Sequence, residues 1–170
     1  MSEYYYIVSK LNGFVLDITG QSKAPVTPVI NYPINKPATS NQLWQRVPTG
    51  PKDPAGGQSQ YYIKSKLNGF VLDIKGRNTG KATPIISFPE NSPASTNQIW
   101  QIEESDIEGY FYITSLLNGY VIDVFGQKKT PGTAAISYPK NVPVTDNQLW
   151  QFILAASDTP SHKKSAFANT

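Results

Sequence analysis

The chain has 170 residues, a formal net charge of +3, fourteen prolines, twelve glycines and no cysteine. This length suits one domain with a sizeable core, whereas three separate domains of fewer than about 60 residues each would be marginally stable. The absence of cysteine excludes disulfides, a thiolate nucleophile and cysteine metal sites, and the scattered lysines lack the clustered basic face that nucleic-acid binding requires.

The N-terminal segment, MSEYYYIVSK, lacks the basic region and long apolar region of a secretory signal. No apolar run approaches the roughly 20 residues that a membrane helix needs. We therefore expect no membrane insertion, and a protein that is cytoplasmic or released without a classical signal peptide.

The first 47 residues predict four short strands joined by turns. Aromatic and β-branched residues indicate the first strand, and Asn12-Gly13 is a strong hairpin signal. Polar loops separate the later strands. The expected strands are Tyr4–Ser9, Phe14–Ile18, Pro28–Tyr32 and Gln42–Val47.

The same order of elements returns twice without a gap, which gives repeats at about 4–47, 60–103 and 110–153. An open stack of repeats would need end units with polar outer faces, yet the outer repeats resemble the middle one. We therefore expect an all-β fold of three four-stranded repeats, closed with pseudo-threefold symmetry, in a single domain over residues 1–154.

The segments outside the repeated strands differ from one another. The connection 46–60 is long and rich in proline and glycine, while the connection 102–110 is shorter and acidic. Residues 155–170 lack periodicity, so we expect a flexible C-terminal tail.

A Gln-x-Trp element ends each repeat. Alternation along a strand would put its Gln and Trp on one face, and we interpret the pair mainly as a packing unit around a shared core. The glutamines are Gln42, Gln98 and Gln148, and the tryptophans are Trp44, Trp100 and Trp150.

An acid recurs in the second strand of every repeat, at Asp17, Asp73 and Asp123. A buried carboxylate is unfavourable unless it is paired or hydrogen-bonded. Two interpretations are open. The acid either caps the amides of the glycine loop that follows it, or it is an acceptor at the rim of a shallow pocket.

An aromatic residue followed by proline, and two asparagines, also recur after each acid. The aromatic residues are Tyr32, Phe88 and Tyr138. The asparagines are Asn35, Asn91 and Asn141, and Asn41, Asn97 and Asn147. A flat ring stacks on the C–H face of a pyranose, a carboxylate accepts from adjacent hydroxyls, and amides discriminate hydroxyl orientation. This set predicts three sugar sites.

These blocks, with the pattern D…[YF]P…NQ[LI]W, resemble the ricin B-type (R-type) β-trefoil lectins over nearly the whole chain, from about Tyr4 to Gln151. The resemblance implies a β-trefoil of six barrel strands and three capping hairpins. It implies a galactose- or N-acetylgalactosamine-type pocket in every repeat.

The resemblance also implies a role for each recurrent residue. The three acids would bind sugar hydroxyls, the aromatic residues would stack on the ring, and Asn41, Asn97 and Asn147 would bond hydroxyls beside the acid. Gln42, Gln98 and Gln148 would hold the acid in place. Asn35, Asn91 and Asn141 match a loop position where galactose-binding members often carry a longer or basic side chain.

The sequence departs from the family at one pocket position. Ile30, Ile86 and Ile136 stand where some family sites carry glutamine. The disulfides of the family are also absent. Pockets in the family vary between galactose, N-acetylgalactosamine and other glycans, so the monosaccharide stays open.

The leading hypothesis is a multivalent lectin whose partners are glycans or glycoconjugates, with a homodimer left open. The alternative is a protein-binding trefoil, such as a protease inhibitor, acting through the connection 46–60. We expect no enzyme, no metal and no cofactor. Each repeat has one recurrent acid, Glu90 is replaced by Ile34 and Lys140 in the other repeats, and the only histidine, His162, lies in the tail.

Overall fold

The computed structural model describes residues 3–50 and 57–156, and these residues form twelve strands and six short 3₁₀ turns. The strands are β1 (Tyr5–Ser9), β2 (Val15–Ile18), β3 (Thr27–Tyr32), β4 (Trp44–Pro48), β5 (Gln60–Ser65), β6 (Val71–Ile74), β7 (Thr83–Phe88), β8 (Trp100–Glu104), β9 (Phe111–Ser115), β10 (Val121–Val124), β11 (Thr133–Tyr138) and β12 (Trp150–Leu154). The turns are η1 (Thr19–Gln21), η2 (Ser40–Gln42), η3 (Lys75–Arg77), η4 (Thr96–Gln98), η5 (Phe125–Gln127) and η6 (Asp146–Gln148).

Six strands close into a barrel by antiparallel pairing in the order β1, β4, β5, β8, β9, β12 and back to β1. The first and last strands pair in register, from Tyr5 opposite Leu154 to Ser9 opposite Trp150. This closure leaves neither end of the repeat array as a free sheet edge, as the sequence analysis expected.

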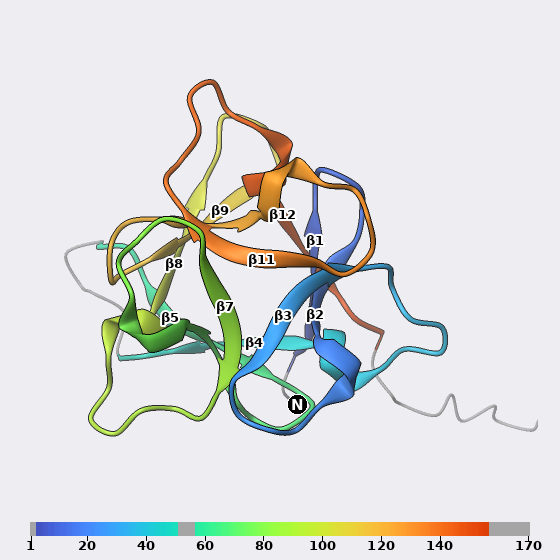
Figure 1. Ribbon diagram of the computed structural model, residues 1–170, viewed down its shortest axis with the longest axis vertical. Helices are drawn as coiled ribbons and strands as arrows, with labels where there is room; N and C mark the ends of the chain where they lie inside the picture. Colours follow the sequence, from blue (N-terminus) through green and yellow to red (C-terminus); the bar gives the residue numbers. More distant parts are fainter. Residues whose placement is uncertain (1–2, 51–56, 157–170) are drawn as a thin grey trace, which may run out of the picture.

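The other six strands form the hairpins β2–β3, β6–β7 and β10–β11, which cap the barrel. Their second strands, β3, β7 and β11, pair with one another around the centre of the molecule. Figure 1 shows the resulting pseudo-threefold arrangement, with one lobe for each repeat. The expected barrel of six strands with three capping hairpins is confirmed.

The core takes five buried side chains from each repeat, so the same positions are used three times. Its members are Ile7, Leu16, Ile18, Val29, Trp44, Ile63, Leu72, Ile74, Ile85, Trp100, Ile113, Ile122, Val124, Ala135 and Trp150. Each tryptophan Nε1 also donates to a main-chain carbonyl, as Trp44 does to Leu16 O at 3.0 Å. The tryptophans therefore belong to the fold, as interpreted from sequence.

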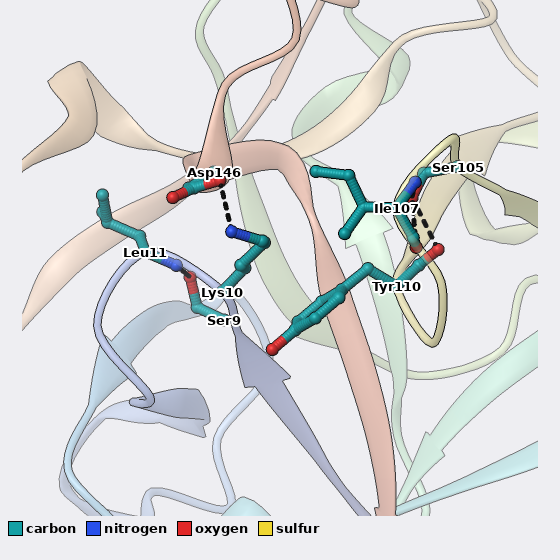
Figure 2. A network of polar contacts seen from close by, with 7 residues as sticks. All are labelled: Ser9, Lys10, Leu11, Ser105, Ile107, Tyr110 and Asp146. Atoms are coloured by element: carbon teal, nitrogen blue, oxygen red, sulfur yellow. Dashed lines mark hydrogen bonds and ion pairs between the residues drawn. The ribbon is translucent and has the colours of Figure 1, made fainter.

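Side-chain and main-chain contacts join the first repeat to the third. Lys10 Nζ lies 2.9 Å from Asp146 Oδ1 and 5.6 Å from the centre of the Tyr110 ring (Figure 2). The Lys10 amide donates to Leu149 O, and the Ala155 amide donates to Tyr4 O at 2.8 Å. Ala155 therefore still contacts the barrel, while residues 157–170 of the expected tail lie outside the described residues.

Several strand boundaries differ from the expectation, by one residue at the starts of β1 and β3 and by more at β4. The fourth strand begins at Trp44 instead of Gln42, because Gln42 belongs to the 3₁₀ turn η2, whose Gln42 and Leu43 amides donate to Thr39 O and Ser40 O. The expected connection 46–60 is shorter, since β4 continues to Pro48 and β5 begins at Gln60, with 51–56 outside the described residues. None of the helices in residues 3–50 and 57–156 is long and apolar enough to cross a membrane.

The Asn-Gly dipeptide does turn the chain between β1 and β2, within a five-residue connection from Lys10 to Phe14. Gly13 has φ +73°, a conformation that favours glycine, and Asn12 Oδ1 accepts a hydrogen bond from the Phe14 amide at 3.0 Å. Phe14 consequently lies in the turn, and β2 begins one residue later than expected.

Candidate functional site

Each recurrent acid lies in the first strand of a capping hairpin, on the face turned away from the core. Asp17 pairs with Ile30 across β2 and β3, and Tyr32 lies two residues further along the same face. Leu16 and Ile18, on the opposite face, join the core. The acid is nonetheless only 3% exposed in all three repeats.

The side chain of Gln42 holds Asp17 in place. Gln42 Nε2 donates to Asp17 Oδ2 and to Pro33 O, both at 2.8 Å, while its Oε1 accepts from the Asn35 amide at 2.9 Å. Gln98 and Gln148 make the same three contacts around Asp73 and Asp123. Because these glutamines are fully buried, they position the acid and have no surface for a ligand.

This geometry corrects two sequence interpretations. In the described residues the hydrogen bond to each acid comes from a glutamine 25 residues later, so the interpretation of the acid as a cap for the following loop is wrong. Gln42 and Trp44 also do not share a strand face, because Gln42 lies in η2 and bonds the acid, whereas Trp44 begins β4. In the Gln-x-Trp element, the glutamine therefore belongs to the candidate site and the tryptophan belongs to the core.

Burial dominates the electrostatics of the acids. It raises the pKa of Asp17 above its usual value, against hydrogen bonds from Gln42 and Asn41 that favour the carboxylate. The pKa of Asp73 is likewise raised by burial, and the positive charge of Arg77 opposes this rise. Burial raises the pKa of Asp123 to about 6. Ionising these acids is therefore unfavourable for the fold.

The predicted amides and rings gather beside the acids. Asn41 is buried, its Nδ2 donates to Ile18 O at 3.2 Å, and its Oδ1 has no protein partner. Asn35 Nδ2 donates to Thr39 Oγ1 at 2.7 Å, which fixes the loop after the aromatic residue. Tyr32 is 40% exposed, so its ring is accessible to a ligand.

Two open hollows contain these residues. The first has a volume of about 260 Å³, and the second has about 340 Å³. The first is lined by Asp17, Thr19, Gly20, Gln21, Ile30, Tyr32, Asn35 and Asn41. The second is lined by Val26, Asp73, Lys75, Gly76, Arg77, Ile86, Phe88, Asn91 and Asn97. All predicted residues of the first and second repeats except the buried glutamines therefore line these two hollows.

The third repeat carries the same internal contacts. Asn147 Nδ2 donates to Val124 O at 3.2 Å, and Asn141 Nδ2 donates to Thr145 Oγ1 at 2.7 Å. Asp123 pairs with Ile136, with the partly exposed Tyr138 two residues further on. We call the three groups, around Asp17, Asp73 and Asp123, the first, second and third sites.

Sequence reasoning missed the residues around these predicted groups. Val26, from the first repeat, lines the second hollow because β3 and β7 pair, and it has φ +64°, an unusual value for a β-branched residue. The residues that flank the glycines of η1 and η3 form the remaining rim of the two hollows. These flanking residues vary from repeat to repeat, and this variation was the sequence signal that could have identified them.

The chemistry of each hollow is that of recognition. A carboxylate with free acceptor capacity lies beside an asparagine amide and an at least partly exposed ring, over an isoleucine. The amide oxygen is free in Asn41, whereas Asn97 Oδ1 accepts a hydrogen bond from Ser95 Oγ at 2.7 Å. Each of the two hollows is lined by one carboxylate. Among the described residues, no group of three or more His, Cys, Asp or Glu side chains is arranged to hold a metal ion.

Comparison with known proteins identifies the family. The family described as ricin-type β-trefoil lectin domain-like matches residues 1–88 and 96–164. The chain belongs to this family. It is thus a β-trefoil and, in general terms, a carbohydrate-binding lectin. A search of curated proteins found no match.

Solved structures of this trefoil type are similar along their whole length. The designed threefold-symmetric protein ThreeFoil is 24% identical with a TM-score of 0.77, over 88% of this chain and 97% of that one. The Rhizoctonia solani agglutinin is 22% identical with a TM-score of 0.73, over 91% and 96%. The earthworm R-type lectin C-half, solved in complex with GalNAc, is 28% identical with a TM-score of 0.64, over 90% and 99%.

Proposed function

We propose that the protein binds galactose- or N-acetylgalactosamine-type glycans without catalysing a reaction, through three similar sites, and cross-links multivalent glycan surfaces. The observation that carries this proposal is the threefold repetition of one contact set. In each repeat a glutamine fixes a buried acid beside an asparagine and a partly exposed aromatic ring.

The contact set matches the chemistry of a pyranose with two adjacent hydroxyls on one face. The acid accepts from both hydroxyls in charge-assisted bonds, the amide oxygen of Asn41 accepts from a further donor, and the Tyr32 ring stacks on the C–H face. The GalNAc complex of the earthworm lectin, at 28% identity, supports the galactose-type assignment.

A non-catalytic role is supported by the lining of the hollows. Glycoside hydrolysis needs two carboxyl groups about 5–10 Å apart on either side of the scissile bond. Asp17 and Asp73 are each the single carboxylate of their hollow. The protein-binding alternative through the connection 46–60 stays a prediction, because residues 51–56 lie outside the described residues.

A glycan array followed by calorimetry on the best monosaccharide tests the proposal. We expect three sites per chain with a Kd on the order of 0.1–1 mM, because each site is shallow and makes few contacts. Replacing Asp17, Asp73 and Asp123 together by Ala should abolish binding and preserve the circular dichroism spectrum. If the alanine variant unfolds, the isosteric triple variant with Asn at the same three positions is used for the binding measurement instead. Normal glycan binding by either folded variant would contradict the site assignment.

A further inference from the structure

The three sites share one backbone but differ in the side chains of the turn that follows the acid. At the two positions around the turn glycine, the first site has Thr19 and Gln21, and the second has Lys75 and Arg77. The third has Phe125 and Gln127. The second repeat therefore carries two positive charges where its neighbours carry none.

Both cations of the second repeat border the hollow that contains Asp73. Gly76 and Arg77 have φ +66° and +55°, and Gly20 and Gln21 have φ +62° and +54°. Because the backbone of the two turns is the same, the first and second sites differ here in chemistry and not in shape. The formal charge of the lining residues is +1 in the second hollow and −1 in the first.

These cations are not engaged elsewhere in the described part of the chain. Neither Lys75 nor Arg77 forms an ion pair there, whereas Lys10, Lys64 and Lys140 do. In the third repeat the nearby Lys128 ammonium lies 5.5 Å from the centre of the Phe125 ring, so it stacks on the rim. Lys75 and Arg77 have no comparable contact and remain available to a ligand.

The rest of the second hollow favours a charged contact. Phe88 replaces the tyrosine of the other sites, and Val26 adds an apolar wall, where the equivalent residues for the first and third sites are Gly132 and Ala82. Apolar walls exclude water and strengthen the attraction between a bound anion and a neighbouring cation. Arg77 also opposes the rise in the pKa of Asp73, which favours the carboxylate that accepts hydrogen bonds from sugar hydroxyls.

We propose that the second site binds a galactose-type sugar carrying an anionic substituent, either a sulfate ester or a carboxylate, which Lys75 and Arg77 recognise while Asp73 binds the ring hydroxyls. This inference rests on the proposed function. A guanidinium matches the planar or trigonal arrangement of oxygens in both groups, and an ammonium adds a second donor. The first site, with Thr19 and Gln21, takes the neutral sugar.

The test uses the full-length chain with only the second site intact, made by Asp17→Asn and Asp123→Asn. Calorimetry compares neutral methyl galactoside with galactose monosulfates and with galacturonic acid. We expect the best anionic sugar to bind about tenfold more tightly at low salt, and this preference to shrink as ionic strength rises. The sulfate and carboxylate probes distinguish the two substituents.

Matched variants exchange residues between equivalent positions of the repeats. Lys75→Thr with Arg77→Gln installs the residues of the first site, and the anionic preference should fall from about tenfold to onefold or below. The control variant Lys23→Thr with Lys36→Ser removes two positive charges from the first repeat. It installs the residues that the second repeat has at the equivalent positions, Thr79 and Ser92. This control should leave the preference for the anionic sugar unchanged. Thr19→Lys with Gln21→Arg, in a chain whose other two acids are Asn, should create the preference in the first site.

The possible outcomes are distinct. If the second-site chain binds neutral galactoside but no anionic sugar more tightly, the inference is wrong and the proposed function stands. Persistence of the preference after Lys75→Thr with Arg77→Gln also overturns it, as does equal competition by inorganic sulfate. If the folded second-site chain binds no sugar at all, the proposed function itself fails for this repeat.

Discussion

At the scale of single residues, the three acids are placed where they destabilise the fold. Each is almost completely buried, and the side-chain amides of one glutamine and one asparagine are the groups that favour its charged form. A carboxylate in that setting loses hydration that two or three donors would be needed to replace. A ligand that brings two hydroxyl donors supplies what the protein leaves out, so the unfavourable burial and the proposed binding have one cause.

The third acid gives a measurable stability effect. Well below pH 3.8, Asp123 is protonated in both folded and unfolded chains. Between the unfolded value of 3.8 and the folded pKa of about 6, only the unfolded chain ionises, so the free energy of unfolding decreases as the pH rises. Asp123→Asn should therefore stabilise the protein by about 2–3 kcal/mol at pH 7.5, with little effect below pH 4.

Urea denaturation at several pH values between 3.5 and 7.5 measures this difference. Asp106→Asn, which changes an exposed acid, is the control and should leave the pH dependence unchanged. A variant Asp123→Asn that is no more stable than the natural chain at pH 7.5 would show that the site compensates the buried charge fully.

Site residues could be predicted from the sequence where their contacts stay within one repeat and recur in all three repeats. Asp17, Tyr32 and Asn41 were identified because their types and spacings occur three times. The resemblance to R-type lectins pointed to Gln42 as the residue that holds Asp17, and the structure shows this contact. Spacing alone left the partner of the acid open, because it does not bring Gln42 back over the acid from a turn 25 residues later. Val26 was missed because it enters the site of another repeat through the pairing of β3 with β7.

At the scale of elements, strand existence was predictable and strand ends were not. In β3 the buried and more exposed residues alternate with the period of two, whereas all four residues of β2 are buried. The start of β4 depends on η2, in which Asn41 and Gln42 turn inward to bond Ile18 O and Asp17. Such tertiary contacts override local strand propensity, and the sequence carries no separate signal for them.

The hairpin loops differ between repeats in one buried contact. Asn12 Nδ2 donates to Asn31 Oδ1 at 2.7 Å, and Asn31 is completely buried. In the second repeat serine stands at the equivalent position, so Asn68 Nδ2 and Ser87 Oγ are both buried without a protein partner. The first repeat therefore ties its β1–β2 connection to β3 more firmly than the second.

Asn31→Ser should reproduce the arrangement of the second repeat and lower the free energy of unfolding by about 1 kcal/mol. The loss of the Asn12–Asn31 hydrogen bond is offset only in part by removal of Asn31 Nδ2, which is buried without a partner. Ser87→Ala should change stability by less than about 0.5 kcal/mol, since that hydroxyl has no partner to lose. Chemical denaturation of both variants checks the prediction. Equal effects of the two changes would show that the Asn12–Asn31 contact adds nothing to stability.

At the scale of the whole molecule, closure of the barrel determines how the sites are presented. The pairing of β1 with β12 and the contact between Lys10 and Asp146 join the first repeat to the last (Figure 2). The three hairpins then carry their sites around the pseudo-threefold axis, one for each lobe (Figure 1). Under the proposed function, sites on separate lobes would engage different glycans, so that one chain would bridge two of them.

This arrangement predicts that valency, more than single-site affinity, sets the strength of surface binding. Chains that keep one acid of Asp17, Asp73 and Asp123, with Asn at the other two, should bind soluble neutral or anionic galactose-type sugars with a single site of ordinary affinity. On a glycan-coated surface the same chains should bind 10²-fold or more weakly than the natural chain, roughly the loss expected when intramolecular rebinding is removed. They should also fail to agglutinate glycan-coated beads. Surface plasmon resonance at low and high glycan density separates the two effects. If the single-site chains remain as tightly bound at high density as the natural chain, the three sites do not act together, and one of them accounts for the binding alone.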